Sequence, residues 1–154
     1  MLNSIKSWQI LSFISIISFL YGLFLPFKEI QNNNLIIEQK TGFEIIYEPV
    51  IESLNNLLLF RITENTYEFI INYIILFGFI LFIISVIILF WSSVSGNELL
   101  AIPSSMIYTI ILFYFLLSSI NGGEIIYNIN FGYYLYMSSI ISAFCIPILY
   151  LHEK

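Results

Sequence analysis

The sequence predicts an all-α membrane protein: an up-down bundle of four transmembrane helices, with a small β-hairpin and a short helix outside the membrane between the first and second helices. Composition is the first observation behind this class. Of the 154 residues, 59% are hydrophobic and 10% are charged, whereas a soluble domain is about 45–50% apolar and about 25% charged. The second observation is that the apolar residues form four long runs. We therefore expect a single transmembrane domain over residues 1–154.

The four predicted spans are residues 8–27, 69–91, 103–120 and 131–151, and a helix needs about 20 apolar residues to cross a bilayer. None of the four contains Asp, Glu, Lys, Arg or His, and each central Leu, Ile, Phe or Val favours insertion by about 0.3–0.6 kcal/mol. A signal peptide is the alternative for the first run. We expect a retained helix there, because the run exceeds the usual apolar core of about 7–15 residues and no A-x-A cleavage site follows.

The segment between the first two spans, residues 28–68, has a pattern of its own. The stretch NLIIEQKTGFEIIYEP predicts strands at Leu35–Gln39 and Phe43–Glu48, with Gly42 in the left-handed position of the hairpin turn. The range Pro49–Phe60 follows with helical apolar spacing, so its proline lies in the first turn of a predicted amphipathic helix. Loop residues that we expect to be available for interaction are Gly42, Phe43, Ile45 and Tyr47.

Membrane sidedness depends on few charges. Four spans place both termini on one side, and Lys6 directly precedes the first span. We therefore expect the termini on the cytoplasmic or matrix side, although Lys28, Lys40 and Arg61 in the long loop nearly balance the count. The Ile-rich sequence holds only two alanines, Ala101 and Ala143. That bias is typical of an AT-rich coding genome and favours a prokaryotic cell membrane or an organellar inner membrane.

The sequence contains little that supports catalysis. Membrane enzymes and pumps keep ionisable groups inside the bilayer for proton and ion transfer, and the predicted spans hold none. The sole histidine, His152, lies at the C-terminus, and the sole cysteine, Cys145, lies in an apolar run. Paired haem ligands, a disulfide and a Cys-based metal site are therefore excluded within the chain. We expect no enzyme, metal or cofactor, and the net charge of −5 argues against a nucleic-acid partner.

Small and hydroxyl-bearing residues recur on single faces of the predicted spans. In the first span they are spaced by three, three and four residues, which is one helix face. We expect these faces to pack helix against helix, the first against the fourth, because small residues let backbones approach in a bilayer. A weakly polar groove for a lipid, quinone or neutral substrate is the alternative. The candidates are Ser12, Ser15, Ser18, Gly22, Ser105, Thr109, Ser138, Ser139, Ser142 and Ala143.

The layout of one span, a long loop with a hairpin and short helix, and three closely linked spans resembles the claudin-like tetraspan arrangement. The resemblance is to topology. That family's loop signature comprises a Trp, a Gly-Leu-Trp and two cysteines, whereas residues 28–68 hold neither Trp nor Cys. The sequence predicts a non-catalytic subunit or accessory (scaffold) protein of a larger membrane complex, with the lipid bilayer and other membrane subunits as partners. The alternative is a small transporter or a protein that binds lipid or another hydrophobic ligand.

Overall fold

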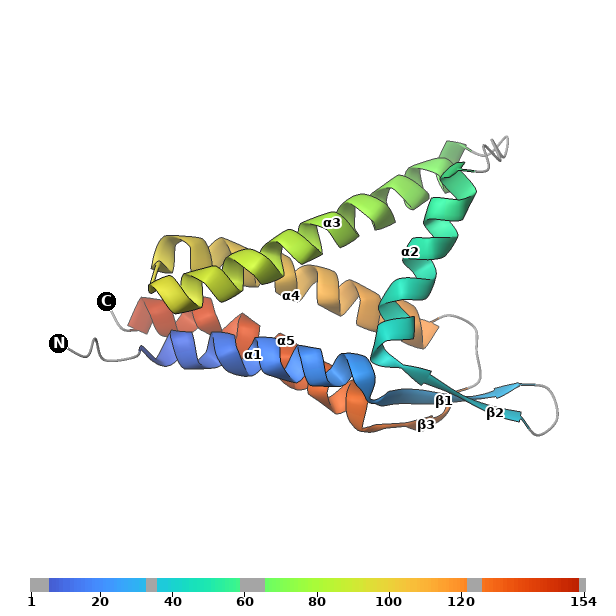
Figure 1. The fold of residues 1–154 in the computed structure, drawn as a ribbon, viewed down its shortest axis with the longest axis horizontal. Helices are drawn as coiled ribbons and strands as arrows, with labels where there is room; N and C mark the ends of the chain where they lie inside the picture. The colour runs from blue at the N-terminus through green and yellow to red at the C-terminus, as the bar shows by residue number, and fades with distance from the viewer. Residues whose placement is uncertain (1–5, 33–35, 59–65, 122–125, 153–154) are drawn as a thin grey trace.

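The structure is a computed structural model, and it describes residues 6–32, 36–58, 66–121 and 126–152. Within these ranges α1, α3, α4 and α5 are long and apolar enough to cross a membrane. The predicted fold class, a four-span helical membrane protein with a small extramembrane sheet and helix, is therefore confirmed. The elements in chain order are α1 (Ser7–Phe24), β1 (Pro26–Asn32), β2 (Ile36–Thr41), α2 (Gly42–Leu58), α3 (Thr66–Ser95), α4 (Glu98–Asn121), β3 (Ile126–Ile129) and α5 (Phe131–His152) (Figure 1).

The spans run up and down, so both ends of the chain lie at one end of the bundle and the sheet lies at the other (Figure 1). We call these the terminal end and the sheet end. Helices α1, α4 and α5 pack along their lengths. Helix α3 lies against α4 near the terminal end and diverges from the bundle toward the sheet end, where α2 crosses from the sheet to the start of α3.

The helix ends have local causes. Helix α1 stops at Phe24, short of the predicted residue 27, because Leu25 precedes a proline and takes an extended conformation. At the other end of the bundle, α3 closes with a glycine C-cap. Gly96 has a positive φ of 71°, and the Asn97 amide donates to the Ser92 carbonyl at 3.1 Å. This tight turn makes α3 and α4 antiparallel neighbours, and both run past their predicted spans.

The sheet differs from the predicted hairpin. Strand β2 overlaps the first predicted strand, but its partner is β1, directly after α1, and the predicted strand at Phe43–Glu48 is wrong. Strand β3, in the expected short loop between the last two spans, pairs antiparallel with the other edge of β1, giving the order β2-β1-β3. The sheet therefore joins the first and last connections at the sheet end of the bundle.

Helix α2 begins at Gly42, seven residues before the predicted start at Pro49. A capping box sets this start: the Thr41 amide donates to Glu44 Oε2 at 2.6 Å, and the Glu44 amide donates to Thr41 Oγ1 at 3.4 Å. Both the turn role predicted for Gly42 and the first-turn position predicted for Pro49 are therefore wrong. The proline lies inside the helix.

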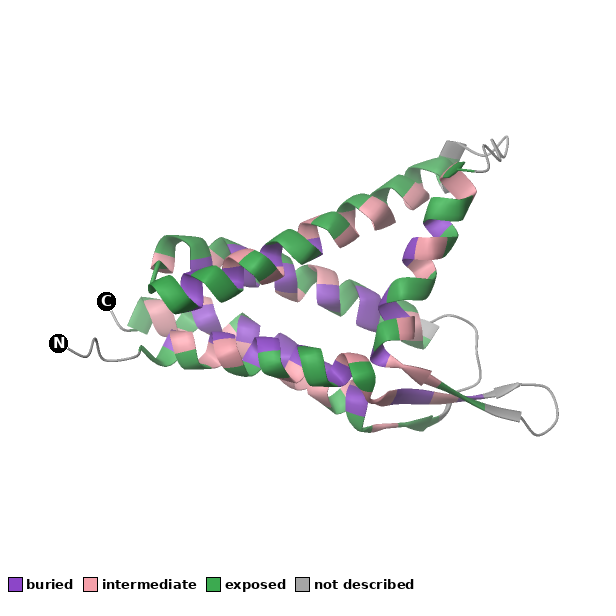
Figure 2. Cartoon of the chain, viewed as in Figure 1, coloured by how far each residue is buried: buried purple, intermediate pink, exposed green. Residues whose placement is uncertain are grey.

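Most of the buried core residues belong to α1, α4 and α5 (Figure 2), and aromatic rings form a cluster among them. The Phe19 ring of α1 stacks on Tyr136 of α5 at a centroid distance of 5.5 Å and meets Tyr108 of α4 edge-on at 5.9 Å. Phe82 of α3 joins this cluster, stacked on Tyr108 at 5.4 Å. One cluster therefore holds the four spans together.

Candidate functional site

Hydroxyl groups join α1 to α5 in the middle of the bundle. Ser15 Oγ donates to the Ser139 carbonyl at 3.0 Å, and Ser139 Oγ donates to the Ser15 carbonyl at 2.8 Å. Because the Ser139 proton is directed at Ser15, the Tyr108 hydroxyl of α4 donates to Ser139 Oγ. All three side chains are buried. We call this cluster the serine seam. Its hydroxyls bond to one another and to backbone, so they line no open path.

The other predicted residues of α1 and α5 lie on or beside the same contact. Gly22 packs on Tyr136, since a Cβ added at Gly22 would lie 2.7 Å from Tyr136 Cδ1. Ser12 is buried, and its Oγ donates to the Trp8 carbonyl of its own helix at 2.9 Å. Ala143 is fully buried. The remaining three are half-buried: Ser18, Ser138 and Ser142.

In the part of the chain that the structure describes, neither hydroxyl of the predicted α4 pair, Ser105 and Thr109, bonds to another helix. Ser105 Oγ donates to the Ile102 carbonyl at 2.8 Å, and Thr109 Oγ1 donates to the Ser105 carbonyl at 2.8 Å. Both hydroxyls are therefore satisfied within α4. The α4 hydroxyl that reaches another helix belongs to Tyr108, which sequence analysis did not single out. Its place between Ser105 and Leu112 on the same face was the available signal.

Three glycines meet where the spans join the extramembrane part. A Cβ added at Gly42 would lie 2.2 Å from the Gly22 carbonyl oxygen, and one at Gly132 would lie 2.7 Å from the Pro26 carbonyl oxygen. The Tyr136 hydroxyl donates to the Gly42 carbonyl at 3.0 Å. We call Gly22, Gly42 and Gly132 the glycine junction. It brings the end of α1, the start of α2 and the start of α5 to backbone contact.

A buried lysine also links the sheet to the bundle. Lys28 of β1 is 4% exposed, and its Nζ donates to the Ser119 carbonyl in the last turn of α4 at 2.6 Å. A cation is favourable there because the last helical carbonyls lack helical partners and carry the negative end of the helix dipole. The sequence suggested only that Lys28 influences topology. Its place at the end of α4 follows from the β1–β3 pairing.

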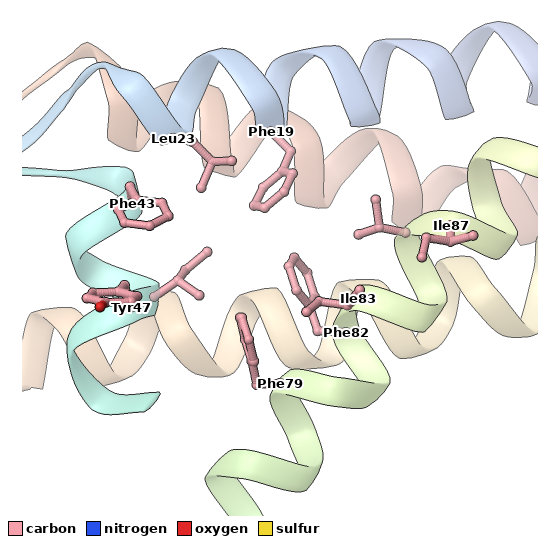
Figure 3. A pocket seen from close by; sticks show the side chains of 10 residues that line it. Phe19, Leu23, Phe43, Tyr47, Phe79, Phe82, Ile83 and Ile87 are labelled. Carbon is pink, nitrogen blue, oxygen red and sulfur yellow. The ribbon is translucent and has the colours of Figure 1, made fainter. Parts of the chain in front are cut away.

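A groove opens between α1, α2 and α3, on the side where α3 leaves the bundle (Figure 3). Its volume is about 240 Å³. Among the lining side chains, only Tyr47 carries a polar atom. We call this feature the α3 groove. Its lining comes from two residues of α1, three of α2 and five of α3: Phe19, Leu23, Phe43, Ile46, Tyr47, Phe79, Phe82, Ile83, Val86 and Ile87.

The four loop candidates divide between the core and the groove. Gly42 and Ile45 are buried, the first in the glycine junction and the second in the core. Phe43 and Tyr47 are exposed and stack on each other at 5.1 Å along the groove rim. Of the loop candidates, only these two aromatic side chains are placed to meet a ligand or a partner.

The chemistry available at the groove is that of shape and apolar contact. The lining holds no carboxylate, imidazole, amine or thiol. Across the described ranges, no group of three or more His, Cys, Asp or Glu residues is placed to hold a metal ion. The groove can therefore bind an apolar group, and the Tyr47 hydroxyl is the one polar group of its lining.

No family model matches this chain, and neither a curated protein nor a solved structure matches it.

Proposed function

We propose that this protein is a non-catalytic integral membrane subunit or accessory protein that binds another membrane protein through α3. The observation that carries the proposal is the low burial of this highly apolar helix. It has the highest mean hydropathy of the four candidate spans, 3.1, yet only 17% of its apolar window is buried, against 33–39% in the others. A span that its own bundle leaves largely uncovered has surface free for a helix of another protein, which would pack on it through van der Waals contact.

The first half of α3 is long and exposes large apolar side chains. The helix has 30 residues, so it is about 45 Å long at about 1.5 Å per residue, longer than a hydrocarbon core of about 30 Å. Where it leaves the bundle, large side chains lie exposed around it, among them Tyr73 at 56%, Ile74 at 60% and Phe77 at 63%. A partner span lying there would gain van der Waals contact with several large side chains.

Site-specific photocrosslinking tests this proposal. A photoreactive residue replaces Phe77 on α3 or, as a control, Phe144 on α5, which is an equally exposed phenylalanine at 62% against 63%. In native membranes followed by mild-detergent purification, we expect the Phe77 probe to capture one or a few discrete proteins and the Phe144 probe to capture lipid. Lipid adducts at both positions, together with a monomer that carries no other protein, would contradict the proposal.

A second candidate function is the binding of a lipid or another hydrophobic ligand. The α3 groove favours it, because an apolar cavity of about 150 Å³ already accepts benzene and this groove has about 240 Å³. The serines that the sequence offered as groove candidates do not line it, and Ser15 and Ser139 are in contact with each other. The groove side chains are therefore those to alter when ligand binding is measured.

A further inference from the structure

We propose that the α3 groove holds one acyl chain of a phospholipid from the leaflet at the sheet end of the bundle. The inference rests on the second candidate function, ligand binding, and is independent of the accessory role. Leu23 lies in the last turn of α1, at the sheet end, and Phe43 and Tyr47 of α2 close the groove on that side (Figure 3). The groove therefore lies in the half of the spans that meets the sheet-end leaflet.

The groove is continuous with the surface that the spans present to the bilayer. Leu20, next to Phe19 on α1, is 46% exposed, and Ile80, next to Phe79 on α3, is 54% exposed. Both belong to candidate membrane spans. An acyl chain that already contacts these outer faces can therefore enter sideways between α1 and α3 without crossing a polar barrier.

The lining favours a flexible chain over a rigid helix. Helices approach each other in bilayers through small residues, and none of the side chains that line the groove is small. The groove is lined instead by Phe, Leu, Ile, Val and Tyr. Lipid tails are as apolar as these side chains, so an acyl chain gains by filling the gap and restoring van der Waals contacts rather than by leaving water.

The charges of α2 lie away from the groove. Along this helix Glu44, Glu48 and Glu52 recur every four residues, and the helix carries no Lys or Arg. Lys40 offsets one of these carboxylates, with its Nζ 2.7 Å from Glu48 Oε2, and Glu52 is exposed. Glu48 lines a separate hollow together with Lys28 and Lys40. The helical spacing places the three carboxylates on a face of α2 turned away from the groove residues Phe43 and Tyr47, so the charges of α2 do not select among phospholipid headgroups.

Native mass spectrometry of delipidated protein with defined lipids tests the inference. The variant Ile83→Trp fills the groove from α3, and Ile84→Trp is the matched control, because Ile84 neighbours Ile83 and is similarly exposed (45% against 43%) but does not line the groove. We expect wild type and Ile84→Trp to retain one phosphatidylethanolamine or phosphatidylcholine per chain. We expect Ile83→Trp to lose it.

Equal lipid retention by the three proteins overturns the inference. Leu23→Trp fills the same groove from α1 and serves if Ile83→Trp does not fold. A fluorescent hydrocarbon without a headgroup, such as pyrene, distinguishes phospholipid binding from the binding of hydrophobic ligands in general. Pyrene binding to wild type but not to the filled variant, with phospholipid binding to neither, would contradict the phospholipid proposal. The second candidate function, ligand binding, would then be supported. If neither probe binds wild type, both proposals fail.

Discussion

The two helices joined by the serine seam, α1 and α5, differ from α3 in how they are placed in the bundle. The apolar windows of α1 and α5 are each 33% buried at hydropathies of 1.6 and 1.7, whereas that of α3 is 17% buried at 3.1. The more hydropathic helix is the less buried one. Lipid tails solvate Leu and Ile as well as a protein interior does. In this protein, burial follows small residues and hydroxyls that let backbones meet, and apolar content alone does not predict it.

Helix α3 shows the same contrast along its own length. At the terminal end, Gln9 Nε2 of α1 donates to the Ser93 carbonyl at 2.7 Å, and the Phe13 and Phe90 rings meet at 6.3 Å. Toward the sheet end, a Cβ added at Gly78 would meet no atom within 4 Å. Helix α3 is therefore attached at one end and open at the other, and the groove occupies the wedge between them.

The largest expected effect on the free energy of unfolding comes from adding one methyl group to a glycine, and we compare Gly42 in the glycine junction with Gly78 on the open part of α3. Gly42→Ala places a Cβ against the Gly22 backbone, which cannot move as a side chain can. We expect it to lower the free energy of unfolding in detergent by about 1–3 kcal/mol or more. Gly78→Ala adds its methyl to open space, so helix propensity predicts a gain of about 1 kcal/mol. Equal effects of the two variants on unfolding would remove the contrast between the regions.

An intermediate effect is expected from enlarging serines on α1. Ser15 is fully buried and bonded across to α5, so Ser15→Leu should destabilise the bundle by about 1–3 kcal/mol through overpacking. Ser18 is half-buried and makes no hydrogen bond to another helix within the described residues. We therefore expect Ser18→Leu to lower the stability of the bundle clearly less than Ser15→Leu. Thermal unfolding of the two variants side by side measures the difference. A larger loss at Ser18 would place the contact on a different face of α1.

The smallest effect is expected from removing single hydroxyls in the serine seam. Tyr108→Phe deletes the bond to Ser139 Oγ, and hydrogen bonds between membrane helices average about 0.6 kcal/mol. A double-mutant cycle with Ser139→Ala should return a coupling energy of about this size. Ser105→Ala removes a bond made within α4 and is the control with little expected change. A coupling energy near zero would mean that shape, and not hydrogen bonding, joins the seam.

The sequence predicted those features that depend on runs and local spacing. The spans follow from hydropathy, and the periodic serines of α1 pointed to a contact with the helix that holds Ser139. The true start of α2 was also legible, in the Thr41-x-x-Glu44 capping box, but the β-prone residues that follow favoured a strand. Strand β3 was not predictable in this way, because its pairing with β1 joins residues about a hundred positions apart.

The α3 groove could not be predicted from the sequence either. Phe79, Phe82 and Ile83 belong to a helix that is apolar on every face, so no periodicity marks the groove side. The groove exists because α3 diverges from α1 at the sheet end while α2 spans the gap. The angle between two helices depends on packing over their whole lengths, which a single sequence pattern does not contain.

The central claim is that α3 leaves the bundle at the sheet end, and spin-label distances in lipid nanodiscs test it most directly. One pair, Phe24 with Phe77, spans α1 and α3 at the sheet end, and a second, Ile10 with Trp91, spans them at the terminal end. All four side chains are exposed, so labels leave the core intact. We predict a clearly longer separation for Phe24–Phe77 than for Ile10–Trp91. Equal separations would mean that α3 lies along the bundle and that the groove is closed, which would contradict the account.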